Sequence, residues 1–112
     1  MVNPANGEKR DAPEYSLDAI RRLAESGHVE YRGKKIPRDV AQLRFNLDDV
    51  LDCLQKLQSH HFAHSIWHES FPRWHDVYKP VYRARDGRTI NLYIKLRLNR
   101  DCVVIQLCSF HD

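Results

Sequence analysis

The hydrophobic pattern of the chain changes period once, near Ser59, and this change limits the fold more than any other feature of the sequence. Before Ser59, apolar residues recur three and four positions apart, as they do on one face of a helix. After Ser59, they alternate with polar residues or run together, as they do in strands. Helices followed by strands are typical of an α+β domain, in which the helices pack on one face of an antiparallel sheet. A chain of 112 residues is long enough for one such domain.

Three helices are expected before the change of period, and a short strand over residues 28–32 lies between the first two. Ser16 can cap the first helix and Asn46 the third, because side chains of both types accept hydrogen bonds from the free N–H groups at a helix start. The expected helices cover residues 17–26, 38–45 and 47–58.

Residues 1–14 are polar, contain two prolines and a glycine, and lack an apolar stripe that could be buried. This composition is typical of a chain terminus without fixed structure. We therefore predict a flexible N-terminal arm over residues 1–14 and a single domain over residues 15–112.

Four strands are expected after Ser59, and the third of them has the clearest alternation. Its apolar side chains would pack on the helices, whereas Tyr93, Lys95 and Arg97 would project from the opposite face of the sheet. The fourth is almost continuously apolar, which predicts a central strand covered on both faces. The expected strands cover residues 62–67, 74–83, 89–98 and 102–110.

The net charge of +3 lies in the second half of the chain, where residues 61–112 hold 8 basic and 5 acidic side chains. A tyrosine between two cations on an open sheet face suits single-stranded RNA, because the ring can stack on a base while the cations hold phosphates. The alternative is an ordinary solvated strand face on which Tyr93 packs against a neighbouring strand.

Histidines also concentrate in this half, with His64, His75 and His111 on three different expected strands. RNA cleavage without a metal needs a base for the 2′-OH, an acid for the 5′-oxygen and cations at the phosphate. Histidine can act as acid or base near neutral pH. The alternative is that these are ordinary polar residues of the sheet.

A zinc site is a further alternative, because His60, His64 and His68 would line one face if the segment were helical. The strand pattern after Ser59 argues against it, so we expect no metal and no cofactor. No phosphate-binding glycine loop, dinucleotide fingerprint or serine-hydrolase motif is present, so the sequence gives no support to those enzyme classes. The three cysteines have no CxxC spacing and fit reduced thiols in the cytoplasm. No apolar run is long enough for a membrane-spanning helix, so no membrane partner is expected.

The second half of the chain also resembles a known family. Four segments carry the resemblance: WHDVYKP over residues 74–80, a glycine turn at Gly87, LYIK over residues 92–95 and the C-terminal SFHD over residues 109–112. In this order they are similar to the MqsR family of toxins. These are mRNA interferases of type II toxin–antitoxin systems. The resemblance implies a RelE-like microbial RNase fold, metal-independent mRNA cleavage that inhibits translation and growth, and a cognate antitoxin protein as partner.

The resemblance also implies the site residues. The family's catalytic set falls on His64, His75, Tyr93 and His111, of which only the tyrosine is the residue type of the best-known member; the others there are lysine, glutamine and lysine. In this interpretation His75 or His64 is the general base and His111 the general acid. The phosphates would be held by Lys79, Lys95 and Arg97, and the product would be a 2′,3′-cyclic phosphate. The alternative is a non-catalytic RNA- or antitoxin-binding module of the same fold.

Overall fold

The computed structural model describes residues 2–112 and has the expected α+β architecture. Its three α-helices are α1 (Leu17–Glu25), α2 (Ile36–Gln42) and α3 (Leu47–Gln55), and a 3-10 turn, η1, covers Ser59–His61. The predicted caps are confirmed: Ser16 accepts a hydrogen bond from the N–H of Ala19, and Asn46 accepts one from the N–H of Asp49. None of the helices among the described residues is long and apolar enough to cross a membrane.

Six strands form the main sheet in the order β1-β3-β4-β7-β8-β2. The consecutive strands β3, β4, β7 and β8 pair antiparallel, as predicted, but β2 pairs parallel with β8, so the sheet is mixed. The strands β3, β4, β7 and β8 form an antiparallel meander, and β8 lies at one edge of it. β2 precedes the meander in the chain and pairs with this edge, in the same direction as β8. The strands of this sheet are β1 (Lys9–Arg10), β2 (Val29–Tyr31), β3 (Phe62–His68), β4 (Arg73–Tyr78), β7 (Tyr93–Leu98) and β8 (Ile105–His111).

Two of the predicted strands are each divided in two. The chain leaves the main sheet after β4 and returns at β7, and the excursion forms a small hairpin of β5 (Val81–Arg83) and β6 (Thr89–Asn91). Pro80 has no N–H to donate to a sheet ladder, and its carbonyl instead accepts a bond from Leu92 at 2.9 Å. This closure brings Lys79, at the end of β4, beside Tyr93, at the start of β7.

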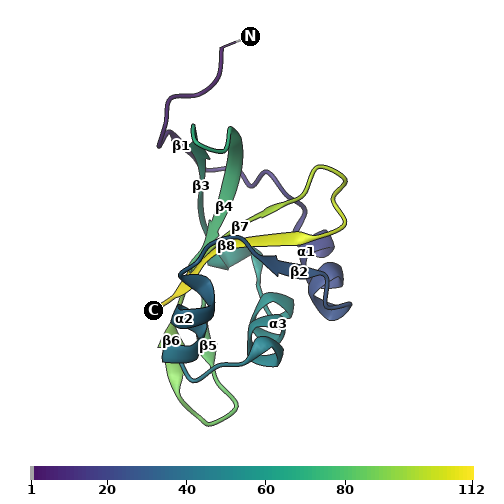
Figure 1. Cartoon of the computed structure of the whole chain (residues 1–112), viewed down its shortest axis with the longest axis vertical. Helices are drawn as coiled ribbons and strands as arrows, with labels where there is room; N and C mark the ends of the chain where they lie inside the picture. The colour runs from purple at the N-terminus through teal and green to yellow at the C-terminus, as the bar shows by residue number, and fades with distance from the viewer. Residues whose placement is uncertain (1) are drawn as a thin grey trace.

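The hydrophobic core lies between one face of the sheet and the helices (Figure 1). Ile94, Leu96 and Leu98 of β7 are all buried there, which confirms the predicted apolar side of that strand. The opposite face carries Tyr93, Lys95 and Arg97 together with polar residues of β3, β4 and β8 that share their rows. We call this the polar face of the sheet.

The segment expected to be a flexible arm is partly docked in the structure. Gly7 donates a backbone hydrogen bond to the carbonyl of Trp67 at 2.8 Å, and β1 continues this pairing along β3. The guanidinium of Arg10 lies over the ring of Trp74, with its carbon 4.2 Å from the ring centroid. Sequence patterns do not predict such docking, because backbone hydrogen bonds at a sheet edge leave no side-chain signature.

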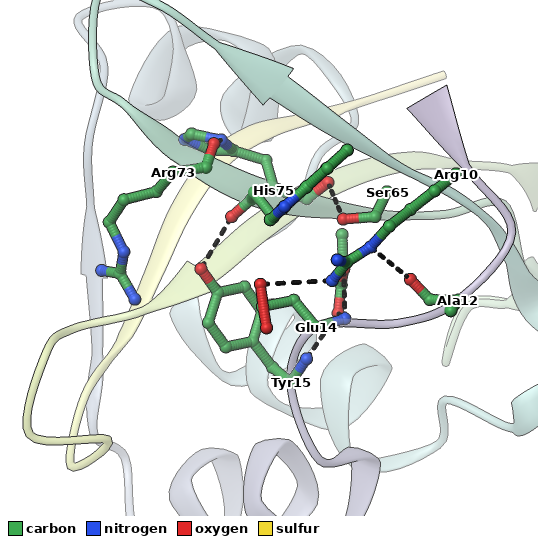
Figure 2. A network of polar contacts seen from close by, with 9 residues as sticks. Arg10, Ala12, Glu14, Tyr15, Ser65, Arg73 and His75 are labelled. Carbon is green, nitrogen blue, oxygen red and sulfur yellow. Dashed lines mark hydrogen bonds and ion pairs between the residues drawn. The ribbon is translucent and has the colours of Figure 1, made fainter. Parts of the chain in front are cut away.

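The arm ends in a network of polar contacts around Glu14 and Tyr15 (Figure 2). Asp76 is fully buried and accepts hydrogen bonds from the backbone N–H groups of these two residues at 3.0 to 3.1 Å. The Tyr15 hydroxyl donates to the carbonyl of Trp74 at 2.7 Å. Asp76 therefore connects the chain before α1 to the centre of the sheet.

Deleting residues 2–12 should lower the thermal stability of the domain. The deletion removes the β1 pairing and the contact of Arg10 with Trp74, which together contribute about 2 kcal/mol. For a domain of this size, a loss of this order lowers Tm by about 5 to 10 °C. Deletion of residues 2–4 is the control, because this part of the chain lies before β1. An unchanged Tm after the longer deletion, measured by thermal circular dichroism, would show that the arm contributes nothing to stability.

Candidate active site

The polar face brings residues from four strands together in rows. The register places His64 of β3, Val77 of β4, Lys95 of β7 and Ser109 of β8 in one row across the sheet. The row on one side of it contains Tyr93 and His111, and the row on the other side contains His75. The predicted site residues therefore all belong to one face, but they form two clusters on it.

The first cluster consists of His64, Lys79, Tyr93 and His111. The rings of Tyr93 and His111 stack with centroids 5.1 Å apart and planes 15° apart. The Lys79 ammonium lies 5.8 Å from the centroid of the Tyr93 ring. The first cluster thus combines two imidazoles, a phenol and an ammonium, each partly or fully open to solvent.

The charges around the first cluster favour a neutral His64. Burial lowers the pKa of His64, and the cations Lys9 and Lys79 lower it further. An imidazole with a depressed pKa stays unprotonated below neutral pH and can accept a proton. Burial also raises the pKa of Tyr93, so its hydroxyl keeps its proton and acts as a hydrogen-bond donor.

The second cluster surrounds Arg97, which the sequence pattern placed on the surface as a phosphate ligand. Arg97 is only 5% exposed. Its guanidinium donates to His75 Nε2 at 2.8 Å, to Gln106 Oε1 at 2.6 Å and to Cys108 Sγ at 3.1 Å. Phe71 covers it, with the guanidinium carbon 3.7 Å from the ring centroid. Alternation identifies the face of a strand residue, but it does not show that a distant turn covers that residue.

His75 has both of its ring nitrogens occupied. Nδ1 donates to the carbonyl of Arg73 at 3.0 Å, which leaves Nε2 as the acceptor for Arg97. Burial, and then the charge of Arg97, lowers the pKa of His75 to about 4. The ring is therefore neutral at pH 7 and has no free nitrogen for a substrate proton. This geometry favours a positioning role for His75 over the predicted catalytic one.

The two clusters are also separated along the sheet. Tyr93 and Arg97 are four residues apart on β7, and a strand advances about 3.3 Å per residue, so their rows lie about 13 Å apart. His75 shares the row of Arg97, whereas His111 pairs directly with Tyr93. His75 is set apart from the first cluster by this row spacing and by the hydrogen bonds that occupy both of its ring nitrogens.

Lys95 lies between the clusters and leans toward the second. Its ammonium donates to His68 Nε2 at 3.1 Å, and the ring of His68 lies 4.7 Å from that of His75. Burial lowers the pKa of Lys95. From the sequence alone, His68 is a candidate only for the zinc site. Because side chains alternate along a strand, His68, four residues after His64 on β3, lies on the same polar face.

The zinc alternative is not supported by the geometry. His60 lies in η1, whereas His64 and His68 lie on β3. Within residues 2–112, no group of three histidine, cysteine, aspartate or glutamate side chains is placed so that it could hold a metal ion.

A family model described as motility quorum-sensing regulator, toxin of MqsA, matches residues 12–112. The chain belongs to the MqsR toxin family. Membership in this family identifies it as a toxin of a toxin–antitoxin system. The match begins within the N-terminal arm and covers every residue of both clusters. Comparison with curated proteins gives no match.

In this MqsR-family chain, His75 should make the folded state sensitive to acid. Its pKa of about 4 in the folded protein lies below the usual 6.5, so the unfolded chain takes up the proton first. The resulting stability is complete above pH 6.5 and is lost as the pH falls toward 4. The loss amounts to about 3 kcal/mol over this window.

Urea unfolding at pH 7 and pH 4 would measure this contribution. His75→Gln keeps an acceptor for Arg97 but cannot be protonated. Between pH 7 and pH 4, its free energy of unfolding should therefore fall by about 3 kcal/mol less than that of the wild type. The exposed His28→Gln serves as the control. Equal acid sensitivity of His75→Gln and the wild type would contradict the depressed pKa.

Proposed function

We propose that this toxin is a metal-independent endoribonuclease that cleaves mRNA and thereby inhibits translation and growth. The observation that supports this most is the first cluster, in which two histidines, a tyrosine and a lysine lie on one open sheet face, with the Tyr93 ring stacked on His111 and next to Lys79. The proposal includes a RelE-like microbial RNase fold and an antitoxin of the MqsA type as partner.

The first cluster supplies the groups needed for attack by the 2′-OH. His64 is the proposed base, because its depressed pKa keeps it neutral. His111 is the proposed acid: Nδ1 contacts the Asp112 carbonyl at 2.9 Å, which leaves Nε2 for the 5′-oxygen. His64 and His111 lie three strand spacings and one row apart, about 16 Å between Cα atoms, so the proposed phosphate sits between them, over Tyr93 and Lys95.

The remaining groups stabilise the charge on the phosphate. The hydroxyl of Tyr93 donates a hydrogen bond to a non-bridging oxygen, and the ammonium groups of Lys79 and Lys95 balance the negative charge of the phosphorane. The bond from phosphorus to the 5′-oxygen breaks as the bond to the 2′-oxygen forms. The products are a 2′,3′-cyclic phosphate and a 5′-hydroxyl.

Cleavage of single-stranded RNA by the purified protein in EDTA tests the proposal. We expect products with cyclic phosphate ends, and we expect arrested growth when the chain is expressed without an antitoxin. RNA that binds but stays intact would favour the non-catalytic RNA- or antitoxin-binding module instead. Cleavage that requires an added metal ion would contradict the proposed chemistry.

A further inference from the structure

Two aromatic residues and three cations surround an open depression beside the second cluster. Its cavity of about 550 Å³ is lined by Tyr31, Arg32, Gly33, Lys34, Phe71 and Arg97. Phe71, in the turn between β3 and β4, is 39% exposed. One face of its ring packs on the guanidinium of Arg97. The exposed part of the ring is open to a ligand.

The side chains of this depression favour an anion that carries a flat ring. Its lining contains three cations and no carboxylate. Glu30 is the acid nearest to Arg32, at 3.7 Å, and it also accepts a hydrogen bond from Gln106. A nucleotide has the matching chemistry, because its base stacks on an aromatic face and its phosphate pairs with cations. The volume lies in the range of small-molecule sites.

The depression is continuous with the polar face. A neighbouring cavity of about 260 Å³ shares Arg32, Phe71 and Arg97 with it and also contains Lys95. Another, of about 280 Å³, shares Lys34 with the depression and extends to His111. The cavity next to His111 is lined by Lys34 and Lys35 and by one carboxylate, that of Asp39. A nucleic-acid strand that crosses the first cluster can therefore continue past the two lysines to Phe71.

We propose that the depression holds a nucleotide of single-stranded RNA that neighbours the scissile phosphate. Its base stacks on Phe71, and its phosphate is bound by Arg32 and Lys34. This inference deepens the proposed function and rests on it. It also assigns a role to His75, Gln106 and Cys108. They hold the Arg97 guanidinium in place beneath the Phe71 ring, so that the stacking surface is formed before RNA binds.

The affinity for a single-stranded 2′-O-methyl RNA tests the stacking contact, because this oligomer has no 2′-OH and cannot be cleaved by the proposed reaction. Phe71→Ala should weaken binding by about 5- to 150-fold, the range for losing one stacked base. Phe71→Trp should keep wild-type affinity. Val81→Ala is the control, because Val81 is also an exposed apolar residue but lies on the β5–β6 hairpin, away from the β3–β4 turn (Figure 1).

An abasic ribose-phosphate oligomer of the same length separates stacking from charge. Phe71→Ala should bind this oligomer as the wild type does, whereas Arg32→Ala and Lys34→Ala should weaken the binding of both oligomers. Each of these two variants should also reduce the slope of log affinity against log salt by about 0.7. Wild-type affinity of Phe71→Ala for the 2′-O-methyl RNA would overturn the inference. The depression would then be a candidate site for a protein ligand instead.

The binding and cleavage measurements fail independently. Loss of affinity in Phe71→Ala, together with a wild type that leaves ordinary RNA intact, would support the nucleotide site and contradict the proposed catalysis. Cleavage by the wild type with no dependence of affinity on Phe71 would support the catalysis and contradict the nucleotide site.

Discussion

Replacing His111 or His64 by alanine should slow RNA cleavage by about 100- to 10,000-fold each, because positioned general acids and bases contribute that much. Tyr93→Phe should also reduce the rate, because it removes the hydroxyl while leaving the ring stacked on His111. The measurement is the single-turnover rate on single-stranded RNA in EDTA. His28→Ala is the control, because His28 is exposed and precedes β2.

The same experiment separates catalytic from positioning histidines. His75→Gln keeps an acceptor for Arg97 and should retain most of the rate, whereas the catalytic interpretation of the sequence predicts a loss as large as for His111. A rate in His75→Gln as low as in His111→Ala would restore His75 to the catalytic set. Full activity of His111→Ala would remove the proposed acid.

The pH profile provides a further check on His64. Its pKa lies below the usual 6.5, so the rate should fall on the acid side only below that value. Lys9→Gln removes one of the two cations that lower this pKa and should move the acid limb to higher pH. Lys9 lies on β1, outside the proposed phosphate contacts, so the plateau rate should change little.

The local elements could be predicted because their signals are local. Ser16 and Asn46 cap their helices as predicted, and the alternation of β7 assigns each of its residues to the correct face. The burial of the Arg97 side chain could not be predicted, because the ring that covers it belongs to Phe71, 26 positions earlier in the chain. The parallel pairing of β2 with β8 joins segments still further apart.

The motif that carries the family resemblance serves the fold more than the chemistry. In WHDVYKP, the ring of Trp74 packs against the guanidinium of Arg10, and Tyr78 is buried in the core. Asp76 accepts hydrogen bonds from the backbone N–H groups of residues 14 and 15. Only Lys79 in this motif lies in the first cluster. A match in this region therefore indicates the fold, and the site must be argued from Tyr93 and the histidines around it.

Asp76→Ala should be the most destabilising substitution of that motif, with a loss of about 3 to 5 kcal/mol in the free energy of unfolding. The side chain is fully buried, and its removal leaves the N–H groups of Glu14 and Tyr15 without their acceptor. Each buried N–H without a partner costs about 1 to 3 kcal/mol, and the lost side chain leaves a cavity as well. Urea unfolding at pH 7 measures the change, with the exposed Asp101→Ala as control.

Asp76→Asn distinguishes the hydrogen bonds from the charge. Burial raises the pKa of Asp76 although the N–H groups of Glu14 and Tyr15 lower it, so the cost of burying the charge exceeds what these hydrogen bonds recover. Asparagine carries no charge and keeps one acceptor oxygen, so its loss should be smaller than that of alanine. A loss below about 1 kcal/mol in Asp76→Ala would mean that the arm is held by β1 and Arg10 rather than by Asp76. If Asp76→Asn lowers the free energy of unfolding as much as Asp76→Ala does, both carboxylate oxygens are required.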